Sequence, residues 1–434
     1  MDAELKAKAA KILSHRHFRQ ITQILVYLGL SRVVTIFATA WASNCLGTHN
    51  CGISGMITAT LAQMNLVIVL HMDALWIRRY KAAPTERERQ ELVAIGLTQR
   101  VIFSVAFALG GLLVAVALRL PREWWLGVGC AVPLLIFNAV QMQWVFVARE
   151  VPSVNYRTTA VISLLSAAAY WLFFRPGQSA GSDIAVLAIA AGVGAVIMLR
   201  QSVGSVWRLP IKISHLHELG PLLIEGRWLI ICGILIYIYA AFEVPLLGYL
   251  CTLSDVGVYS RAYNLANGIN QALGLIPIVL YPRILDWQKA GVPYMWNRLK
   301  KVSAIASLAL LPVIGMVFLV SPLLFHFLYR PEFRGASYPF AILFASRCIE
   351  MINVLIGQGL LAQSQERHIF RIIVPTSLIS LCLNVAFIPA YGMWAAACIN
   401  LASQVLFLIG TLILARILLE KPYLNRGNNP PVKS

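Results

Sequence analysis

Long apolar runs are the feature that most limits what this chain can fold into. Twelve runs of about seventeen or more residues are long enough to cross a hydrocarbon core of roughly 30 Å as α-helices. Only 12% of the 434 residues are charged, whereas a soluble protein carries about 25%. The sequence therefore predicts an all-α polytopic membrane protein with twelve transmembrane helices.

The predicted spans divide into two sets of six. They are Gln20–Cys45, Ile53–Ile77, Val101–Leu118, Trp124–Ala148, Thr158–Phe174, Ile184–Val206, Trp228–Cys251, Gly257–Pro282, Val302–Phe325, Tyr338–Ala362, Ile372–Pro389 and Met393–Leu418. The segment Leu46–Met56 after the first span resembles Leu253–Ala262 after the seventh, with Gly52 aligned to Gly257. An even number of spans gives both repeats the same orientation, which predicts two parallel six-helix bundles with a central cleft.

The predicted domains follow from this division. Residues 1–206 form the N-terminal bundle, 207–227 a cytoplasmic interfacial linker, 228–418 the C-terminal bundle, and 419–434 a disordered cytoplasmic tail.

The distribution of basic residues predicts the orientation. Most of the 36 Lys and Arg residues lie in alternate connections, so both termini are expected in the cytoplasm. Membrane orientation also explains the net charge of +18 without a nucleic-acid partner. The basic segment Met1–Arg19 lacks a cleavage pattern, so the first span is expected to be retained.

One predicted span carries a polar stripe. In Gly257–Pro282, four polar residues recur at steps of three and four: Arg261, Asn264, Asn267 and Gln271. They share an arc of roughly 120° on a helix, and Asn270 falls outside that arc. Such residues line a polar cavity or bind neighbouring helices, and we favour the cavity because the stripe includes an arginine. Pro277 follows the stripe and can kink this span.

Other charged residues also fall within the predicted spans. Arg32 and Arg261 have no acid at helical spacing, whereas Arg347 is followed by Glu350 three residues later. A lining role in a cationic substrate cavity and a structural ion pair therefore remain alternatives for Arg347. The acids Asp73, Glu243 and Glu350 are candidates for coupling to H⁺ or Na⁺, with salt bridges as the alternative.

No motif indicates enzyme chemistry or a cofactor. A P-loop, G-x-S-x-G, H-E-x-x-H and a complete G-x-G-x-x-G are absent from the sequence. The eight cysteines have no metal-ligand spacing, and a disulfide among Cys45, Cys51 and Cys251 is an open alternative to three packed thiols.

Several short motifs resemble a known family. They are Leu46–Gly47 with Cys51–Gly52, the segment Gly257–Ser260 with Ala262, Pro277 with Pro282, Pro331–Phe333 with Ala336, and Pro389–Gly392 with Ala395–Ala396. With twelve spans and a basic chain, they resemble the O-antigen and exopolysaccharide flippases of the multidrug/oligosaccharidyl-lipid/polysaccharide exporter superfamily.

The resemblance implies a function. Such a protein moves undecaprenyl-diphosphate-linked oligosaccharide across the bacterial inner membrane by alternating access, with polysaccharide polymerase and chain-length machinery as partners. A cation-coupled multidrug antiporter of the same superfamily is the first alternative, although its cavity would be acidic. A membrane glycan polymerase or ligase is the second, although such enzymes carry a large outer loop that this chain lacks.

Overall fold

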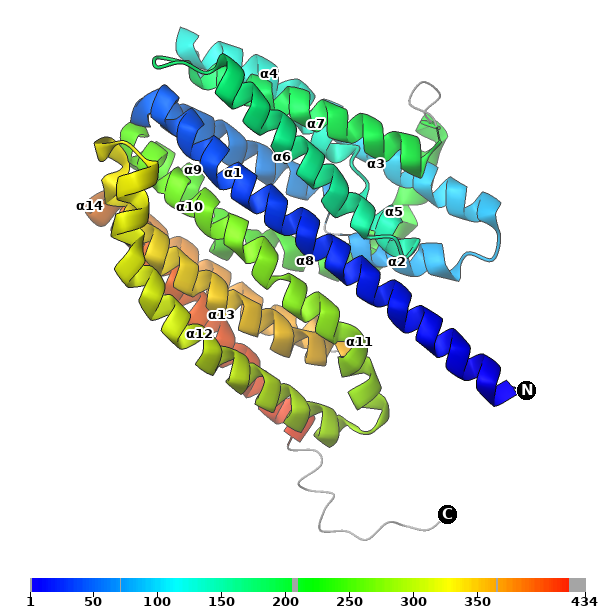
Figure 1. The fold of residues 1–434 in the computed structure, drawn as a ribbon. Coiled ribbons are helices and arrows are strands. Elements are labelled where there is room, and N and C mark those ends of the chain that lie inside the picture. Colours follow the sequence, from blue (N-terminus) through cyan, green and yellow to red (C-terminus); the bar gives the residue numbers. More distant parts are fainter. Residues whose placement is uncertain (1, 71, 205–209, 364–365, 421–434) are drawn as a thin grey trace. The chain divides into compact units, whose positions relative to one another are not determined.

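All regular secondary structure in the described part of the chain is helical (Figure 1). The computed structural model describes residues 2–70, 72–204, 210–363 and 366–420. The helices are α1 (Asp2–Val69), α2 (Asp73–Ala82), α3 (Glu86–Ala117), α4 (Arg122–Ala139), α5 (Gln143–Ala148), α6 (Ser153–Phe173), α7 (Ala180–Ser202), η1 (Ile213–His215), α8 (Leu216–Ala241), α9 (Glu243–Leu250), α10 (Leu253–Leu273), α11 (Leu275–Lys289), α12 (Val292–Leu328), η2 (Pro331–Ala336), α13 (Ser337–Ala362), α14 (Glu366–Ala415) and η3 (Arg416–Glu420). The all-helical prediction is confirmed.

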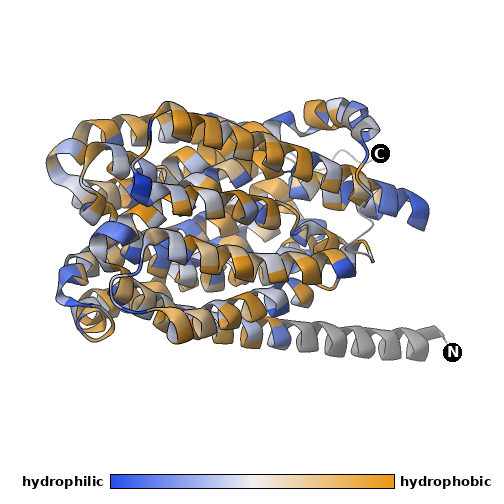
Figure 2. Cartoon of the chain, turned by 90° about the horizontal axis from the view of Figure 1, so that it is seen from above, coloured by the Kyte–Doolittle hydropathy of each residue, from blue (hydrophilic) through white to orange (hydrophobic). Residues whose placement is uncertain are grey.

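Eight helices within the described ranges are long and apolar enough to cross a membrane. Apolar residues dominate along the helices, and hydrophilic ones are concentrated near their ends and connections (Figure 2). Two of the eight, Thr22–Val69 and His368–Leu419, contain 48 and 52 residues. At 1.5 Å per residue each is more than twice as long as a hydrocarbon core is thick, about 30 Å. Each is interrupted by a glycine with positive φ, Gly47 at 75° and Gly392 at 57°.

Two predicted spans are helical but are not among the eight. The stretches are Thr158–Phe174, in α6, and Gly257–Pro282, in α10 and α11. Polar residues such as Arg157 and Arg261 dilute the apolar character of these helices. The total of twelve crossings therefore stays a prediction.

Three predicted spans are broken in the structure, and one of these breaks lies near Pro277, where the sequence suggested a kink. The fourth ends at Ala139 and resumes as α5, the seventh resumes as α9, and the eighth resumes as α11 after Gly274. Pro245 and Pro277 explain the last two breaks, because a proline removes one helical hydrogen bond and its ring clashes with the carbonyl four residues earlier. That carbonyl belongs to Ala241 and Leu273, the last residues of α8 and α10.

The second predicted span ends earlier than expected. Helix α1 stops at Val69, and Leu70 adopts a φ of 56°, which turns the chain out of the helix. Asp73 is consequently the first residue of α2 rather than part of the second span, and this corrects its predicted placement.

The chain divides into two compact units. Unit 1 comprises Met1–Leu46 and Ile57–Ile230, and unit 2 comprises Gly47–Met56 and Ile231–Ser434. Residues 216–227 of the predicted linker form the first part of α8, while 205–209 and 421–434 lie outside the described residues. The predicted domain assignment, including a disordered tail, stays a prediction.

Unit 1 is held together around two buried indole rings. Trp76 of α2 and Trp144 of α5 stack with their ring centroids 5.7 Å apart, and both are at most 1% exposed. Tyr80 packs edge-on against Trp144 and accepts a hydrogen bond from Arg149 Nε at 3.0 Å. The remaining guanidinium nitrogens of Arg149 donate to the carbonyls of Gln201 and Ser202, the last two residues of α7. A basic group at a helix C-terminus is favourably placed for the helix dipole.

Unit 2 is built around α13, which contacts α10, α11, α12 and α14. Leu355 and Leu360 on α13 are fully buried against Met295 and Leu299 of α12. Because other helices cover α13, the polar side chains on its inner faces are removed from water.

Candidate functional site

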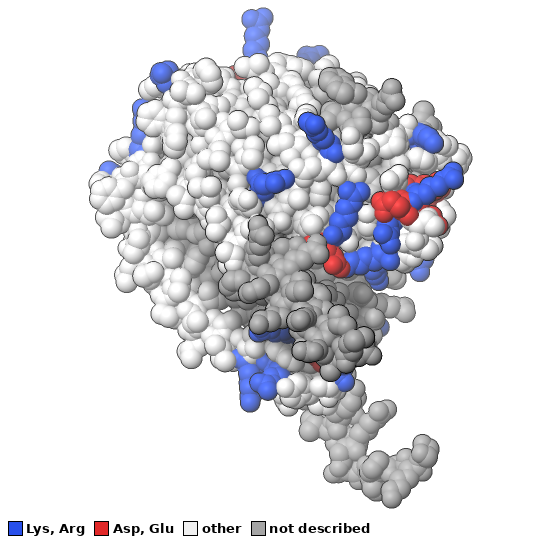
Figure 3. Space-filling view, turned by 45° about the vertical axis from the view of Figure 1, so that its right-hand side comes forward, with Lys and Arg blue, Asp and Glu red and all other residues white. Residues whose placement is uncertain are grey.

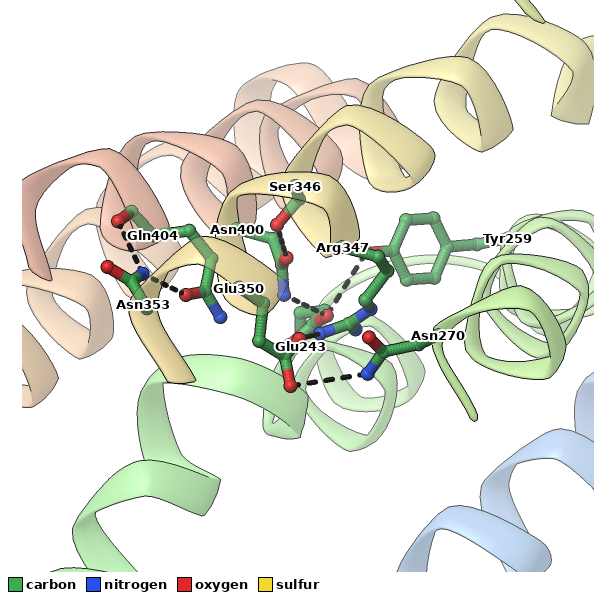
Figure 4. A network of polar contacts seen from close by, with 9 residues as sticks. All are labelled: Glu243, Tyr259, Asn270, Ser346, Arg347, Glu350, Asn353, Asn400 and Gln404. Carbon is green, nitrogen blue, oxygen red and sulfur yellow. Dashed lines mark hydrogen bonds and ion pairs between the residues drawn. The ribbon is translucent and has the colours of Figure 1, made fainter. Parts of the chain in front are cut away.

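The centre of unit 2 contains a buried ion pair on α13. Arg347 Nη1 lies 2.7 Å from Glu350 Oε2, and the side chain of Arg347 is 2% exposed, against 27% for Glu350 (Figure 4). The two residues are three positions apart on one helix, so their side chains lie on the same face. The structure thus contains the ion pair that the sequence left as an alternative for Arg347.

A second carboxylate, Glu243, lies in the same region. Its Oε1 accepts a hydrogen bond from Asn400 Nδ2 at 2.8 Å and one from the Tyr259 hydroxyl at 3.4 Å (Figure 4). Asn400 is oriented in turn by Ser346, whose hydroxyl donates to Asn400 Oδ1 at 2.6 Å. Glu243 is 2% exposed and opens α9, where the helix break places it. Four helices, α9, α10, α13 and α14, therefore contribute to one carboxylate site.

Two tyrosines extend the network along α10. The guanidinium of Arg347 lies over the ring of Tyr263, 5.4 Å from its centroid, and Tyr263 stacks on Tyr259 at 6.3 Å. Asn267 forms a side-chain hydrogen bond with Tyr263, and Asn270 Nδ2 donates to Glu350 Oε1 at 3.2 Å. Cation–π contact and hydrogen bonds thus hold the charged groups in place.

The charges of this cluster can accommodate an ion. Arg347 acts electrostatically on both Glu243 and Glu350. With both acids ionised, one guanidinium between two carboxylates leaves one negative charge uncompensated. A buried charge without compensation is costly, so the cluster is chemically suited to hold one proton or one monovalent cation.

The predicted stripe on α10 is only partly connected to this cluster. Arg261 is buried at 6% exposure, Asn267 is half-buried, and Asn264 and Gln271 are exposed. Asn267 reaches the cluster through Tyr263. Asn270, which lies outside the predicted stripe, contacts Glu350 directly. The lining of a substrate cavity by this stripe stays a prediction.

The remaining predicted site residues belong to unit 1. Arg32 is half-buried on α1. Asp73 pairs with Arg100, whose Nη2 lies 2.7 Å from Asp73 Oδ1, and the exposed fractions of the two side chains are 46% and 3%. Arg100 Nη1 also lies 3.4 Å from Ala139 O and 3.5 Å from Gln141 O, where α4 ends. Asp73 therefore helps to close the corner formed by α2, α3 and α4.

Sequence reasoning missed most of the neutral residues of the cluster. They are Tyr259, Tyr263, Asn270, Ser346, Asn353, Asn400 and Gln404. Asn353 Nδ2 donates to Gln404 Oε1 at 3.0 Å and continues the polar line from α13 to α14. Helical spacing was the available signal, because Ser346, Glu350 and Asn353 recur at steps of four and three on α13.

None of the eight cysteines, all of which lie within the described ranges, takes part in a disulfide. Cys45 and Cys51 are buried and Cys251 is half-buried. The alternative of packed thiols therefore holds for these three residues in this structure.

The fold matches solved structures of membrane exporters. The lipid II flippase MurJ in an inward closed conformation covers 94% of this chain and 93% of its own, with a TM-score of 0.72 and 12% identity. An inward-facing multidrug resistance MATE transporter of the MOP superfamily covers 94% of this chain and 100% of its own, with a TM-score of 0.67 and 11% identity. The class defined by this fold is that of polytopic membrane proteins built like MurJ and MATE transporters.

Within this class, the chain belongs to the Polysaccharide biosynthesis protein family, which matches residues 18–288. A putative O-antigen transporter of Escherichia coli (strain K12) is 22% identical over 404 residues, or 89% of this chain and 94% of the relative. The probable low-salt glycan biosynthesis flippase Agl15 of Haloferax volcanii is 23% identical over 241 residues, or 55% of this chain. That match spans about half of Agl15 (50%). The resemblance predicted from short motifs is confirmed, as is the prediction of a transport protein rather than an enzyme.

Proposed function

We propose that this protein is a flippase that moves lipid-linked oligosaccharide from the inner to the outer leaflet of the bacterial inner membrane. The observation that carries the proposal is the family match, together with a putative O-antigen transporter that aligns over 89% of the chain. The proposed lipid carrier is undecaprenyl diphosphate, and the proposed product is a surface polysaccharide or exopolysaccharide. We also propose twelve crossings in two six-helix bundles, with both termini in the cytoplasm.

We assign binding of the headgroup of this substrate to the polar stripe of α10, which includes Arg261, and to Arg32. Arginine stays charged in a low-dielectric environment and pairs bidentately with phosphate. Arg261 is buried two turns into α10, beyond the reach of the helix dipole, so its own guanidinium supplies the attraction for an anion. The exposed carboxamides of Asn264 and Gln271 supply further donors for diphosphate or sugar hydroxyls. Arg32 is proposed as the contribution of unit 1.

We assign ion coupling to the Glu243–Arg347–Glu350 cluster rather than to substrate binding by Arg347. The support is the charge balance, in which two carboxylates share one guanidinium. Binding of one H⁺ or Na⁺ would neutralise the cluster, and its release would drive the conformational cycle. Asp73 is given a structural role, since it pairs with Arg100.

The test is complementation of a deletion strain, with surface glycan as the readout. We expect Arg261→Ala to abolish glycan export, Arg261→Lys to restore part of it, and the exposed Arg334→Ala to leave it unchanged. All variants are compared at equal membrane abundance. Normal export by Arg32→Ala and Arg261→Ala would show that these arginines do not bind the headgroup.

The fold likeness to a multidrug transporter supports a second candidate, a cation-coupled drug antiporter. Drug accumulation in the deletion strain separates the two functions. A flippase predicts loss of glycan with unchanged drug accumulation, whereas an antiporter predicts the reverse.

A further inference from the structure

The hairpin between α11 and α12, called the platform below, lies at one end of unit 2 (Figure 1). Its turn is made by Gly291, which has a φ of 120°. The inner side of the hairpin is fully buried, with Ile284 and Met295 both 0% exposed. Gln288 Nε2 donates to Ala362 O at 2.7 Å and so caps the end of α13. The platform is therefore fixed to the core by packing and by a hydrogen bond.

The outer side of this hairpin is strongly basic. Residues 275–301 contain five basic side chains and a single acid, Asp286, which gives a net charge of +4. The five, all of them exposed, are Arg283, Lys289, Arg298, Lys300 and Lys301. Asp286 pairs with Lys289 at 3.0 Å, next to the turn of the hairpin.

Aromatic rings fix two of these cations in position. The guanidinium of Arg298 lies 5.2 Å from the centroid of the Tyr294 ring, and its Nε donates to the Tyr294 hydroxyl at 3.1 Å. Lys300 Nζ lies 5.6 Å from the centroid of the buried Trp296 ring. Contacts of this kind reduce the side-chain entropy that a cation loses when it binds a ligand.

The length of α12 places these cations at headgroup depth. The helix has 37 residues and is therefore about 55 Å long, well beyond the roughly 30 Å of a hydrocarbon core. Its uninterrupted apolar stretch begins at Val302, directly after Lys300 and Lys301. The basic end consequently projects past the hydrocarbon on the side that the distribution of Lys and Arg assigns to the cytoplasm.

In unit 1, unlike in the hairpin, several exposed basic residues are paired with acids. Arg79 pairs with Glu225, Lys81 with Glu150 at 3.2 Å, and Arg89 with Glu86 at 3.6 Å. Figure 3 shows the basic and acidic side chains on one face of the molecule, where the visible acidic ones lie next to basic ones. A general enrichment of Lys and Arg at the inner face explains why both units carry basic residues there. It does not explain why the hairpin has five basic residues and only one acid.

We propose that the α11–α12 hairpin is a docking surface for the phosphate headgroups of anionic phospholipids in the inner leaflet. Its five cations are spread along two helices rather than converging on one point, which suits several headgroups better than a single diphosphate. Basic side chains near an anionic membrane surface each contribute about 1 kcal/mol, which corresponds to roughly a fivefold change in affinity. The proposal goes beyond glycan transport and does not depend on which glycan is carried.

The test measures lipid binding to the purified full-length protein by native mass spectrometry. The protein is titrated in separate arms with phosphatidylglycerol, with phosphatidylcholine and with undecaprenyl diphosphate. We expect preferential binding of phosphatidylglycerol over phosphatidylcholine. The variant Arg298→Gln/Lys300→Gln/Lys301→Gln should lose this binding by on the order of 100-fold. The charge-conserving Arg298→Lys/Lys300→Arg/Lys301→Arg should keep most of it.

A matched control removes the same charge from unit 1 at the three cations that are paired with acids, with Arg79→Gln/Lys81→Gln/Arg89→Gln. It should bind phosphatidylglycerol like the wild type, and thermal melting of each variant shows whether it is folded. Equal binding by the hairpin variant and this control would overturn the proposal. Selective loss of undecaprenyl diphosphate binding in the hairpin variant would also overturn it, and would assign the surface to the substrate instead. Because the readout is lipid binding, its failure is distinct from failure of the proposed transport.

Discussion

Asn400 on α14 holds the carboxylate of Glu243 on α9 by a 2.8 Å hydrogen bond, although 157 residues separate them in the chain. Asn400 is itself oriented by Ser346, and both residues are at most 2% exposed. The carboxylate is therefore held in one orientation within a buried site. It is the group to which the proposed ion coupling is assigned.

Replacement of Glu243 by glutamine tests this role. The carboxamide has the same shape and still accepts from Asn400, so folding should be retained. We expect ion-driven transport in proteoliposomes to fall at least tenfold, because the neutral group cannot exchange a proton or Na⁺. Asn353→Ala serves as the comparison, because it truncates a polar side chain of α13 without changing the charge. Undiminished ion dependence in Glu243→Gln would exclude this carboxylate from coupling.

We expect replacement of Arg347 and replacement of Glu350 to change the free energy of unfolding by different amounts. Removal of the Arg347 side chain leaves Glu243 and Glu350 without their shared cation, whereas Glu350→Gln leaves one acid and one base. Loss of one partner of a buried ion pair costs about 3–5 kcal/mol. We therefore expect Arg347→Gln to destabilise the protein more than Glu350→Gln, and Glu243→Gln to offset part of the loss in a double variant. Unfolding in sodium dodecyl sulfate measures the free energy of unfolding of the three single variants and of the double variant. Equal losses in Arg347→Gln and Glu350→Gln would contradict this charge balance.

The Asp73–Arg100 pair is expected to contribute to folding and not to transport. Asp73→Asn leaves a guanidinium that is 3% exposed with two long contacts to carbonyls, and we expect a loss of about 2 kcal/mol in the free energy of unfolding. Lys81→Gln removes a pair whose side chains are 52% and 69% exposed, and should cost less than about 1 kcal/mol. Unfolding of the two variants is compared in the same detergent. A transport defect in a fully stable Asp73→Asn protein would instead return Asp73 to the ion-coupling candidates.

Local patterns predicted the helices, and some of the site, for identifiable reasons. Apolar runs identify helices because the lipid requires them, and Arg347 with Glu350 is visible as a pair three residues apart. The corner at Asp73 was not visible, since it depends on a positive φ at Leu70 that no glycine or asparagine signals. The partners of Glu243 come from α10 and α14, and hydropathy carries no information on which polar residues of different helices meet.

Gly52 and Gly257 are aligned as equivalent positions of the two sequence repeats, and the structure brings them into contact within unit 2. A Cβ on Gly52 would lie 1.8 Å from Leu253 O, and one on Gly257 would lie 1.9 Å from Thr48 O and 3.0 Å from Gly52 N. Backbone atoms cannot yield as a flexible side chain would, so each alanine must separate the two helical segments.

We therefore expect Gly52→Ala and Gly257→Ala each to destabilise the protein by at least about 1–3 kcal/mol, the usual cost of overpacking. The double variant should cost less than the sum, because the first substitution already separates the segments. Gly110→Ala on α3 is the matched control: its Cβ would meet nothing within 4 Å, and alanine in a helix interior is favoured over glycine by up to about 1 kcal/mol. Unfolding in detergent provides the comparison, and additive losses in the double variant would mean that the two glycines do not share one crossing.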